Sequence, residues 1–166
     1  GPRRSSVFPT PYRQELNYES YLEASAVNLK CTGRRLSKQS FAILKKIREV
    51  DEFIRNSELQ NKIREMHPEI CFWALNGYKP MGYNKKKVEG IRERTLLLKQ
   101  FYSNSEKLIE EVKSKYLRKD VAVDDIIDAL AGAIAAKNKN NLRTLPIHPE
   151  LDEKGLRMEI VYANIF

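Results

Sequence analysis

The sequence predicts a helix-rich α/β fold, and three observations support this class. Several stretches carry apolar residues at the i, i+3, i+4 spacing of amphipathic helices. Only two short segments have the composition or alternation of strands. Hydrophobic residues make up 42% of the 166 residues, which is typical of a folded chain. This length suffices for one domain with its own core, so we assign residues 1–166 to a single domain.

The elements follow one another with recognisable boundaries. Three prolines within the first eleven residues predict an extended loop. Strands are expected at 63–66 and 157–162, and polar loops at 78–84 and 137–149. Helices are expected at 18–29, after the N-cap Ser37 as far as Ile54, at 68–75, after the three lysines at 85–87, at 105–117 and at 123–136.

Charge and cysteine content restrict the classes of function. The formal net charge of +8 raises the expectation of a polyanionic partner such as nucleic acid, although many basic domains bind none. Cys31 and Cys71 lie forty residues apart without a CxxC motif, so neither a disulfide framework nor a zinc site is predicted. The sequence shows no apolar run of membrane-spanning length and no signal peptide, so we predict a cytoplasmic protein without a membrane partner.

The helix expected at 123–136 is the most informative stretch. Ile127, Leu130, Ala131 and Ile134 form one apolar stripe, and small residues at 129, 132, 133 and 136 form a second face that would allow very close packing. Acidic residues are unexpected on a helix buried on both faces. Asp125 and Asp128 nevertheless stand three residues apart at its beginning, and this spacing places them on one face.

These acids have two interpretations. Asp124 or Asp125 could cap the helix or stabilise its first turn through the helix dipole. Asp128 lies a full turn further in, where capping does not explain it. Clustered carboxylates repel one another unless a cation neutralises them, so Asp125 and Asp128 are also candidates for a divalent-metal site.

A second acidic candidate lies between the strand expected at 63–66 and the helix that follows it. Glu65 falls at the carboxyl end of this strand, the edge where ligands gather in α/β sheets. Glu69 has a simpler explanation as a first-turn acid, and His67 as a capping or loop residue. Pro68 suits the first position of the new helix.

Three runs in this order resemble a largely uncharacterised family of predicted RNase H-like nucleases. The runs are Arg-Ser-Ser-Val-Phe at 4–8, Arg-Glu-Met-His-Pro-Glu at 64–69 and Asp-Ile-Ile-Asp-Ala-Leu at 125–130. The paired lysines at 85–86 and the segment 90–94 add to the resemblance, which covers nearly the whole chain. The last helix is also similar to that of RuvC-type Holliday-junction resolvases.

The resemblance implies a site and a chemistry. In that superfamily, acids from the first strand, the fourth strand and the last helix bind Mg²⁺ or Mn²⁺. Glu65 would be the fourth-strand acid, with Asp125 and Asp128 as the helix pair, and these three would be both catalytic and metal-binding. The implied reaction is phosphodiester hydrolysis of DNA or RNA by two metal ions. Lys38, Lys86 and Arg94 are then candidates for contacts with backbone phosphates.

The chain departs from the family pattern at its beginning. The family usually opens with an Asp-bearing strand and further strands ahead of the Arg-Ser-Ser run, whereas this chain begins almost on that run. We therefore expect an RNase H-like domain with an incomplete sheet, possible self-association through an open sheet edge, and weak or no activity as this fragment. Two alternatives to a nuclease are a non-catalytic nucleic-acid-binding or interaction module, and hydrolysis of another phosphorylated molecule.

Overall fold

The computed structural model describes residues 9–55, 58–60 and 62–165, which form helices and one two-stranded antiparallel sheet. The helix-rich α/β class is therefore confirmed. The chain divides into two compact units, residues 1–63 and 64–166, which we describe separately. The run at 4–8 and the first part of the predicted N-terminal loop lie outside the described residues.

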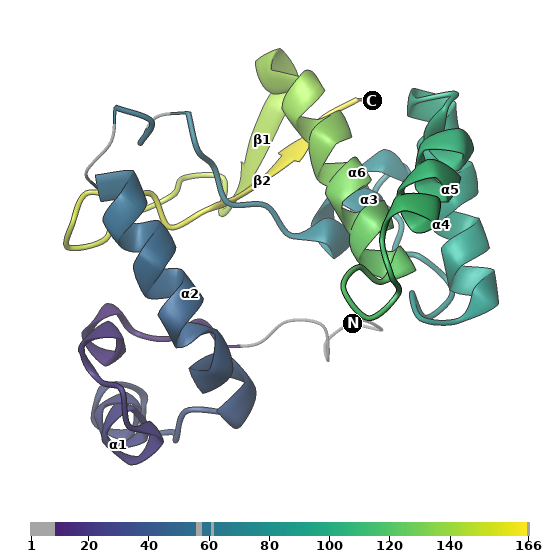
Figure 1. The fold of residues 1–166 in the computed structure, drawn as a ribbon. Coiled ribbons are helices and arrows are strands. Elements are labelled where there is room, and N and C mark those ends of the chain that lie inside the picture. The colour runs from purple at the N-terminus through teal and green to yellow at the C-terminus, as the bar shows by residue number, and fades with distance from the viewer. Residues whose placement is uncertain (1–8, 56–57, 61, 166) are drawn as a thin grey trace. The chain divides into compact units, whose positions relative to one another are not determined.

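The elements are coloured along the chain in Figure 1. The first unit contains η2 (Arg13–Asn17), α1 (Tyr21–Thr32) and α2 (Lys38–Arg55). The second unit contains α3 (Pro68–Leu75), α4 (Val88–Phe101), α5 (Ser105–Lys115), α6 (Val123–Lys137), η3 (Lys139–Asn141), β1 (Leu142–Leu145) and β2 (Ile160–Ala163). Within the described residues, no helix combines the length and the apolar character needed to cross a membrane.

The first unit has a small core beneath α2. Ala24, Leu36 and Leu44 are buried together. Ser37 caps α2 as predicted, because its Oγ accepts a hydrogen bond from the Ser40 amide at 3.0 Å. Few apolar side chains are buried in this unit, so polar contacts contribute to its stability as well.

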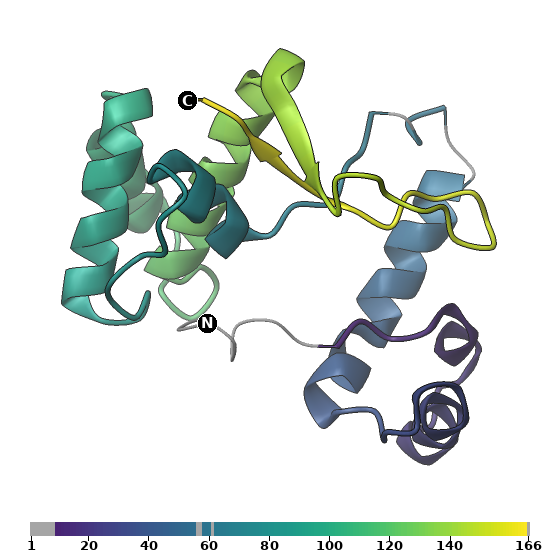
Figure 2. The same cartoon turned by 180° about the vertical axis from the view of Figure 1, so that it is seen from behind.

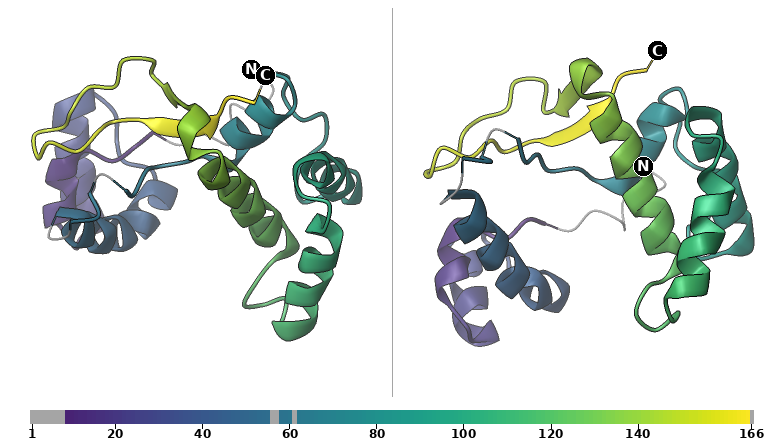
Figure 3. Two further views of the ribbon diagram at one scale, coloured as in Figure 1. Left: turned by 90° about the horizontal axis from the view of Figure 1, so that it is seen from above. Right: turned by 45° about the horizontal axis from the view of Figure 1, so that its top comes forward.

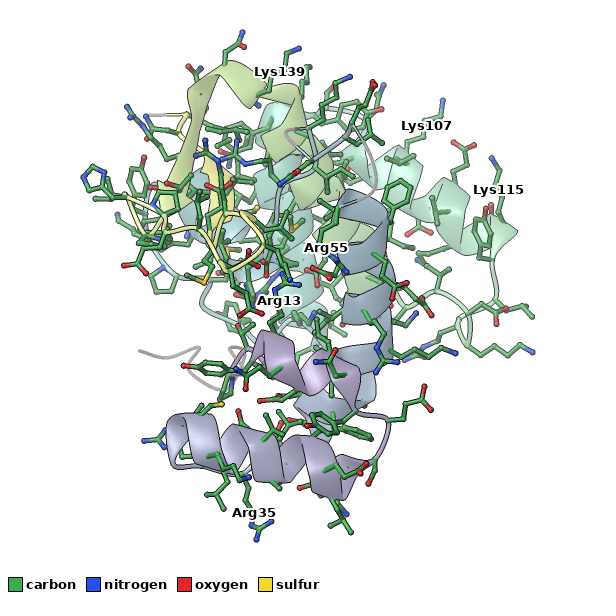
Figure 4. All side chains as sticks on the ribbon, turned by 90° about the vertical axis from the view of Figure 1, so that its left-hand side faces the viewer. Arg13, Arg35, Arg55, Lys107, Lys115 and Lys139 are labelled. Carbon is green, nitrogen blue, oxygen red and sulfur yellow. The ribbon has the colours of Figure 1, made fainter. Side chains whose placement is uncertain are left out.

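One such contact joins η2 to α2. The buried Asp51 accepts hydrogen bonds from Arg13 Nη1 at 2.5 Å and from Arg55 Nε at 2.9 Å. The two arginines lie close together beside α2 (Figure 4). A buried carboxylate shared by two guanidinium groups fixes the position of η2 on α2.

A second acid of this unit is buried without any such partner. Glu15 is fully buried, and neither carboxyl oxygen has a hydrogen-bond partner in the described part of the chain. Burial raises the pKa of Glu15, and the contact of its carboxyl with the Tyr12 backbone opposes this only in part. A raised folded-state pKa favours the protonated acid, so stability is greatest at acid pH and is lost as the pH rises through that pKa.

We therefore expect Glu15→Gln, which removes the charge but keeps the shape, to raise the melting temperature of the first unit by a few degrees at pH 8. The advantage over the wild type should shrink as the pH falls through 4, because Glu15 then becomes protonated in the unfolded chain as well as in the folded one. Thermal unfolding followed by circular dichroism across this range measures the difference. A constant difference at every pH would contradict a raised pKa for the Glu15 carboxyl.

The second unit is built around α6. This helix lies between the β1–β2 pair and the α4–α5 pair, as Figures 1 and 3 show. Seen from behind, α3 crosses the opposite side of α6 (Figure 2). The predicted stripe of α6 is buried, with Ile127 at 1% exposure and Ala131 fully buried. Burial of such a stripe is the main source of stability for an amphipathic helix.

The second, small-residue face of α6 is largely solvent-exposed, and the prediction that it is buried is wrong. Ala129, Ala133 and Ala136 are exposed. Gly132 does lie against a neighbour, because a Cβ there would approach the Met66 terminal methyl to 2.3 Å. Small residues permit close packing but do not require it, so their spacing alone did not identify a buried face.

The sheet is smaller than a full α/β sheet and differs in part from the prediction. β1 pairs with β2 in antiparallel register, with Leu142 opposite Ala163 and Leu145 opposite Ile160. β1 falls within the segment 137–149, so the prediction of a loop there is wrong. The strand expected at 63–66 is reduced to a single bridge from Met66 to Val161. Within the described residues, β1 has no partner on its outer edge, and self-association through that edge stays a prediction.

Candidate functional site

Two acids at the beginning of α6 share one face of the helix. Ala122 is the N-cap residue, and Asp124 and Asp125 lie in the first turn. The interpretation of Asp124 and Asp125 as first-turn acids is therefore confirmed, whereas the alternative that one of them caps the helix is wrong. Asp124 and Asp128 stand four residues apart and are both partly buried, whereas Asp125 is exposed to solvent. The pair that faces the protein is thus Asp124 with Asp128.

Lys85 lies between these two carboxylates. Its Nζ donates a hydrogen bond to Asp128 Oδ2 at 2.6 Å and lies 3.6 Å from Asp124 Oδ2. The other carboxylate oxygen, Asp128 Oδ1, is buried and has no hydrogen-bond partner in the described part of the chain. An ionised oxygen in this state retains an unused capacity to accept a hydrogen bond or bind a cation.

Burial and neighbouring charge act together on this group. Burial raises the pKa of Asp128, Lys85 lowers it, and the negative charges of Asp124 and Glu69 raise it further, so that the net shift is upward. Burial lowers the pKa of Lys85, but its two aspartate partners raise it more, so the ammonium stays charged. Asp128 therefore carries its charge at a cost that one lysine does not fully offset.

The neighbouring end of α3 carries a second ion pair. Arg94 Nη2 of α4 donates a hydrogen bond to Glu69 Oε1 at 2.7 Å, and the arginine side chain is only 1% exposed. Its guanidinium also lies 5.3 Å from the ring centroid of Phe72. We call Glu69, Lys85, Arg94, Asp124 and Asp128 together the Asp128 cluster.

The loop that carries Lys85 is fixed to the beginning of α4. Arg94 Nη1 donates hydrogen bonds to the carbonyls of Tyr83 at 3.1 Å and Gly90 at 3.2 Å. The Glu93 carboxylate accepts from the amides of Gly82 at 2.7 Å and Tyr83 at 3.1 Å. The position of Lys85 is therefore set by α4, and not by its contact with α6 alone.

Burial of the cluster extends to the core beneath it. Burial raises the pKa of the Cys71 thiol to about 11, and the charge of Asp128 adds to this shift. The Cys71 side chain is 1% exposed, as expected for a core residue. Asp128 thus reaches from α6 towards α3, where water is largely excluded.

The three acids predicted to bind metal are not brought together as a set. Asp125 is exposed, and the backbone oxygen of Glu65 accepts a hydrogen bond from the Val161 amide at 2.8 Å. Partial desolvation raises the pKa of the Glu65 carboxyl, and the nearby charge of His67 lowers it. Among residues 9–55, 58–60 and 62–165, no three His, Cys, Asp or Glu side chains form a ready metal site. The predicted metal set thus stays a prediction.

The three basic residues predicted to contact phosphates differ in their exposure to solvent. Lys38 and Lys86 are exposed, and in the described part of the chain neither ammonium pairs with a carboxylate. Arg94 is buried, and its guanidinium donates hydrogen bonds to the Glu69 carboxylate and to two backbone carbonyls. A phosphate could reach Arg94 only if these bonds broke, so we leave it out of the proposed nucleic-acid contacts.

Three residues of the cluster, Glu69, Lys85 and Asp124, are not among the site residues predicted from the sequence, and Glu69 is explained there as a first-turn acid. Lys85 is one of three consecutive lysines and contributes to the family resemblance, but no sequence pattern predicts its pairing with the acids of α6. Asp124 was explained as a helix-end acid. His67 does act as the N-cap of α3, since its Nδ1 accepts a hydrogen bond from the Glu69 amide at 3.2 Å. Pairs formed between α4, α6 and the loop before α4 depend on the tertiary fold, which local patterns do not specify.

The fold and the Asp128 cluster define a helix-rich α/β protein with a partly buried acid pair at the start of its central helix. The chain belongs to the family described as protein of unknown function (DUF429), whose family model matches residues 1–151. Comparisons with the curated proteins and with the solved structures gave no match.

Proposed function

We propose that the protein is an RNase H-like, metal-dependent phosphodiesterase that acts on nucleic acid, with Asp128 as the central metal-binding acid. The observation that carries the proposal is the buried Asp128 Oδ1, which lacks a partner while Lys85 occupies the other oxygen. The resemblance of the acidic runs to predicted nucleases points in the same direction. The basic net charge of +8 suits a polyanionic substrate.

The oxygen atoms of the Asp128 cluster could supply part of the ligand set of a divalent cation. Asp128 and Asp124 supply carboxylate oxygens on one face of α6, which suits the preference of Mg²⁺ and Mn²⁺ for oxygen ligands. Burial first, and then the negative charges of Asp124 and Glu69, raise the pKa of Asp128, and an added positive charge would offset both effects. Glu65 and Asp125 are the further acids that the family resemblance implies for this site.

The side chains of the cluster have separate roles under this proposal. Lys85 orients Asp128 and keeps it ionised in surroundings that favour the neutral acid. The Arg94–Glu69 pair holds the loop before α4, and through it Lys85. When bound, the metal would activate water and stabilise the leaving oxygen of the phosphodiester. Exposed Lys38 and Lys86 would attract the phosphate backbone of the substrate.

The metal site is tested by Asp128→Asn. With Mn²⁺ at a free concentration of about 100 times its Kd, we expect the wild-type protein to gain about 2.7 kcal/mol of unfolding free energy, and the variant to gain almost nothing. The gain should disappear on acidification at a higher pH than for an ordinary aspartate, because the pKa of Asp128 is raised. Thermal unfolding with and without Mn²⁺ measures both effects.

Asp120→Asn is the matched control, because Asp120 is an exposed acid in the loop before α6. It should keep the whole Mn²⁺ gain. Lys85→Met should bind Mn²⁺ more tightly if the ammonium and the metal compete for Asp128. Equal Mn²⁺ gains in the wild type and in Asp128→Asn would exclude a site at Asp128. Cleavage of labelled single-stranded and double-stranded DNA and RNA then tests the reaction itself.

A non-catalytic nucleic-acid-binding module is the second candidate function. It is favoured by the ion pair with Lys85, which already neutralises one oxygen of Asp128 without metal. Under this alternative, nucleic acid should bind equally well with and without a chelator, and affinity should fall steeply with salt. Binding titrations at two salt concentrations with and without EDTA separate the two candidates.

A further inference from the structure

The first unit contains a cavity that the Asp128 cluster does not include. Its volume is about 320 Å³, within the range of sites for small ligands. It lies beside the turn between α1 and α2 and is lined by Pro9, Thr10, Asn28, Thr32, Arg34, Arg35, Leu36, Ser37 and Ser40. None of these residues is acidic, two are arginines and four carry hydroxyl groups.

Both arginines are available for an anion. Among the described residues, neither Arg34 nor Arg35 forms an ion pair with a carboxylate. Both residues are exposed at the rim of the cavity, and Arg35 extends outward from the helices of this unit (Figure 4). The two arginines are consecutive in the chain and both line the cavity, so a phosphate there could accept N–H groups from guanidinium side chains that have no acidic partner among the described residues.

Hydrogen bonds fix the backbone that forms the wall of the cavity. Asn28 is 7% exposed, and its Nδ2 donates a hydrogen bond to the Arg34 carbonyl at 2.8 Å. Thr32 Oγ1 accepts from the Arg34 amide at 3.1 Å, so two contacts hold the backbone that carries the arginines. Gly33 makes the turn possible, because its φ of +72° is costly for other residues.

The wall also offers polar groups to a ligand. The Asn28 amide nitrogen is engaged with the Arg34 carbonyl, which leaves Oδ1 as the acceptor that this side chain can offer to the cavity it lines. The hydroxyls of Ser37 and Ser40 hydrogen-bond each other at 2.8 Å, and Ser40 Oγ also donates to the Pro9 carbonyl at 3.3 Å. They therefore form part of the wall at the beginning of α2, where the helix dipole adds positive potential. An acceptor beside cationic donors suits a ligand that carries hydroxyl groups together with a phosphate.

We propose that this cavity binds the phosphate group of a nucleotide, with Arg34 and Arg35 on the phosphate and Asn28 Oδ1 accepting from a hydroxyl of the sugar. The inference does not require the proposed nuclease site, because every residue involved lies in the first unit. The nucleotide could be free or part of a strand, since both present the same phosphate and sugar chemistry.

The test is the double variant Arg34→Gln/Arg35→Gln. Calorimetric titration with adenosine monophosphate should show about tenfold or greater loss of affinity relative to the wild type. The matched control is Lys45→Gln/Lys46→Gln, which removes the same charge from exposed positions of α2 and should change affinity less than about twofold. Arg34→Lys/Arg35→Lys should restore part of the affinity, because charge returns without the guanidinium geometry.

Three results would overturn the proposal. They are no binding of adenosine monophosphate to the wild type, equal losses in both glutamine double variants, or binding of inorganic phosphate as tight as that of the nucleotide. Titration with a short oligonucleotide distinguishes a free nucleotide from a nucleic-acid strand. If the oligonucleotide binds more tightly than the mononucleotide, the site is one for a strand. Repeating the titrations on Asp128→Asn keeps the inference separate from the proposed function, because affinity at the cavity should not change.

Discussion

Replacing Arg94 by methionine is expected to destabilise the second unit by about 3–5 kcal/mol, the usual cost of removing one partner of a buried ion pair. The Arg94 side chain is 1% exposed, and its loss would leave the Glu69 carboxylate, itself 14% exposed, without its cation. It would also remove the hydrogen bonds that the guanidinium donates to the carbonyls of Tyr83 and Gly90. Denaturant unfolding of the variant and the wild type measures the loss.

Arg92→Met is the matched control, since Arg92 is an exposed arginine of the same helix and should cost much less than about 1 kcal/mol. The double variant Arg94→Met/Glu69→Gln should recover part of the lost stability, because no unpaired buried charge remains. A double variant as unstable as Arg94→Met alone would show that packing, and not the ion pair, accounts for the loss.

Elements with strong local signals were predictable from the sequence. Pro68 at the first helical position identified the start of α3, and Ser37 identified the start of α2. The 3.6-residue spacing of Ile127, Leu130 and Ile134 gave the buried stripe of α6. Each of these signals acts within one or two helical turns, so a single sequence is enough to reveal it.

Features that depend on distant partners were not predictable in the same way. β1 is four residues long and follows an Asn-Lys repeat, and it is a strand because Arg143 and Thr144 lie opposite Tyr162 and Val161. Arg94 is predicted from the sequence as a candidate phosphate contact, whereas in the structure it is buried and paired with Glu69, which lies 25 residues earlier. Sequence periodicity carries no information about such long-range pairs.

The candidate site was predictable in part for the same reason. Asp128 stood out because capping could not explain an acid one turn inside α6. Its nearest cation, Lys85, comes from a loop more than forty residues earlier, and the contact exists only because α4 holds that loop. The sequence therefore pointed to the acid, whereas the tertiary structure determines its partner.

Replacing Gly90 by alanine should displace the loop that positions Lys85 beside Asp128. A Cβ at Gly90 would lie 2.0 Å from the Asn84 carbonyl oxygen and 2.6 Å from its carbon, so the backbone of the loop before α4 would have to move. Overpacking costs about 1–3 kcal/mol, and we expect the upper end because the clash is with backbone. The better helix propensity of alanine returns about 1 kcal/mol, which leaves a net loss of about 2 kcal/mol.

The same displacement should separate Lys85 from Asp128, because Lys85 directly follows Asn84. We therefore expect Gly90→Ala to change Mn²⁺ binding together with stability. Gly132→Ala is the matched control, since its Cβ would meet only the flexible end of Met66, and it should stay within about 1 kcal/mol of the wild type. Unfolding with and without Mn²⁺ measures both variants. If Gly90→Ala and Gly132→Ala had the same unfolding free energy and the same response to Mn²⁺, the loop before α4 would be able to move at little cost. The position of Lys85 would then not be determined by α4.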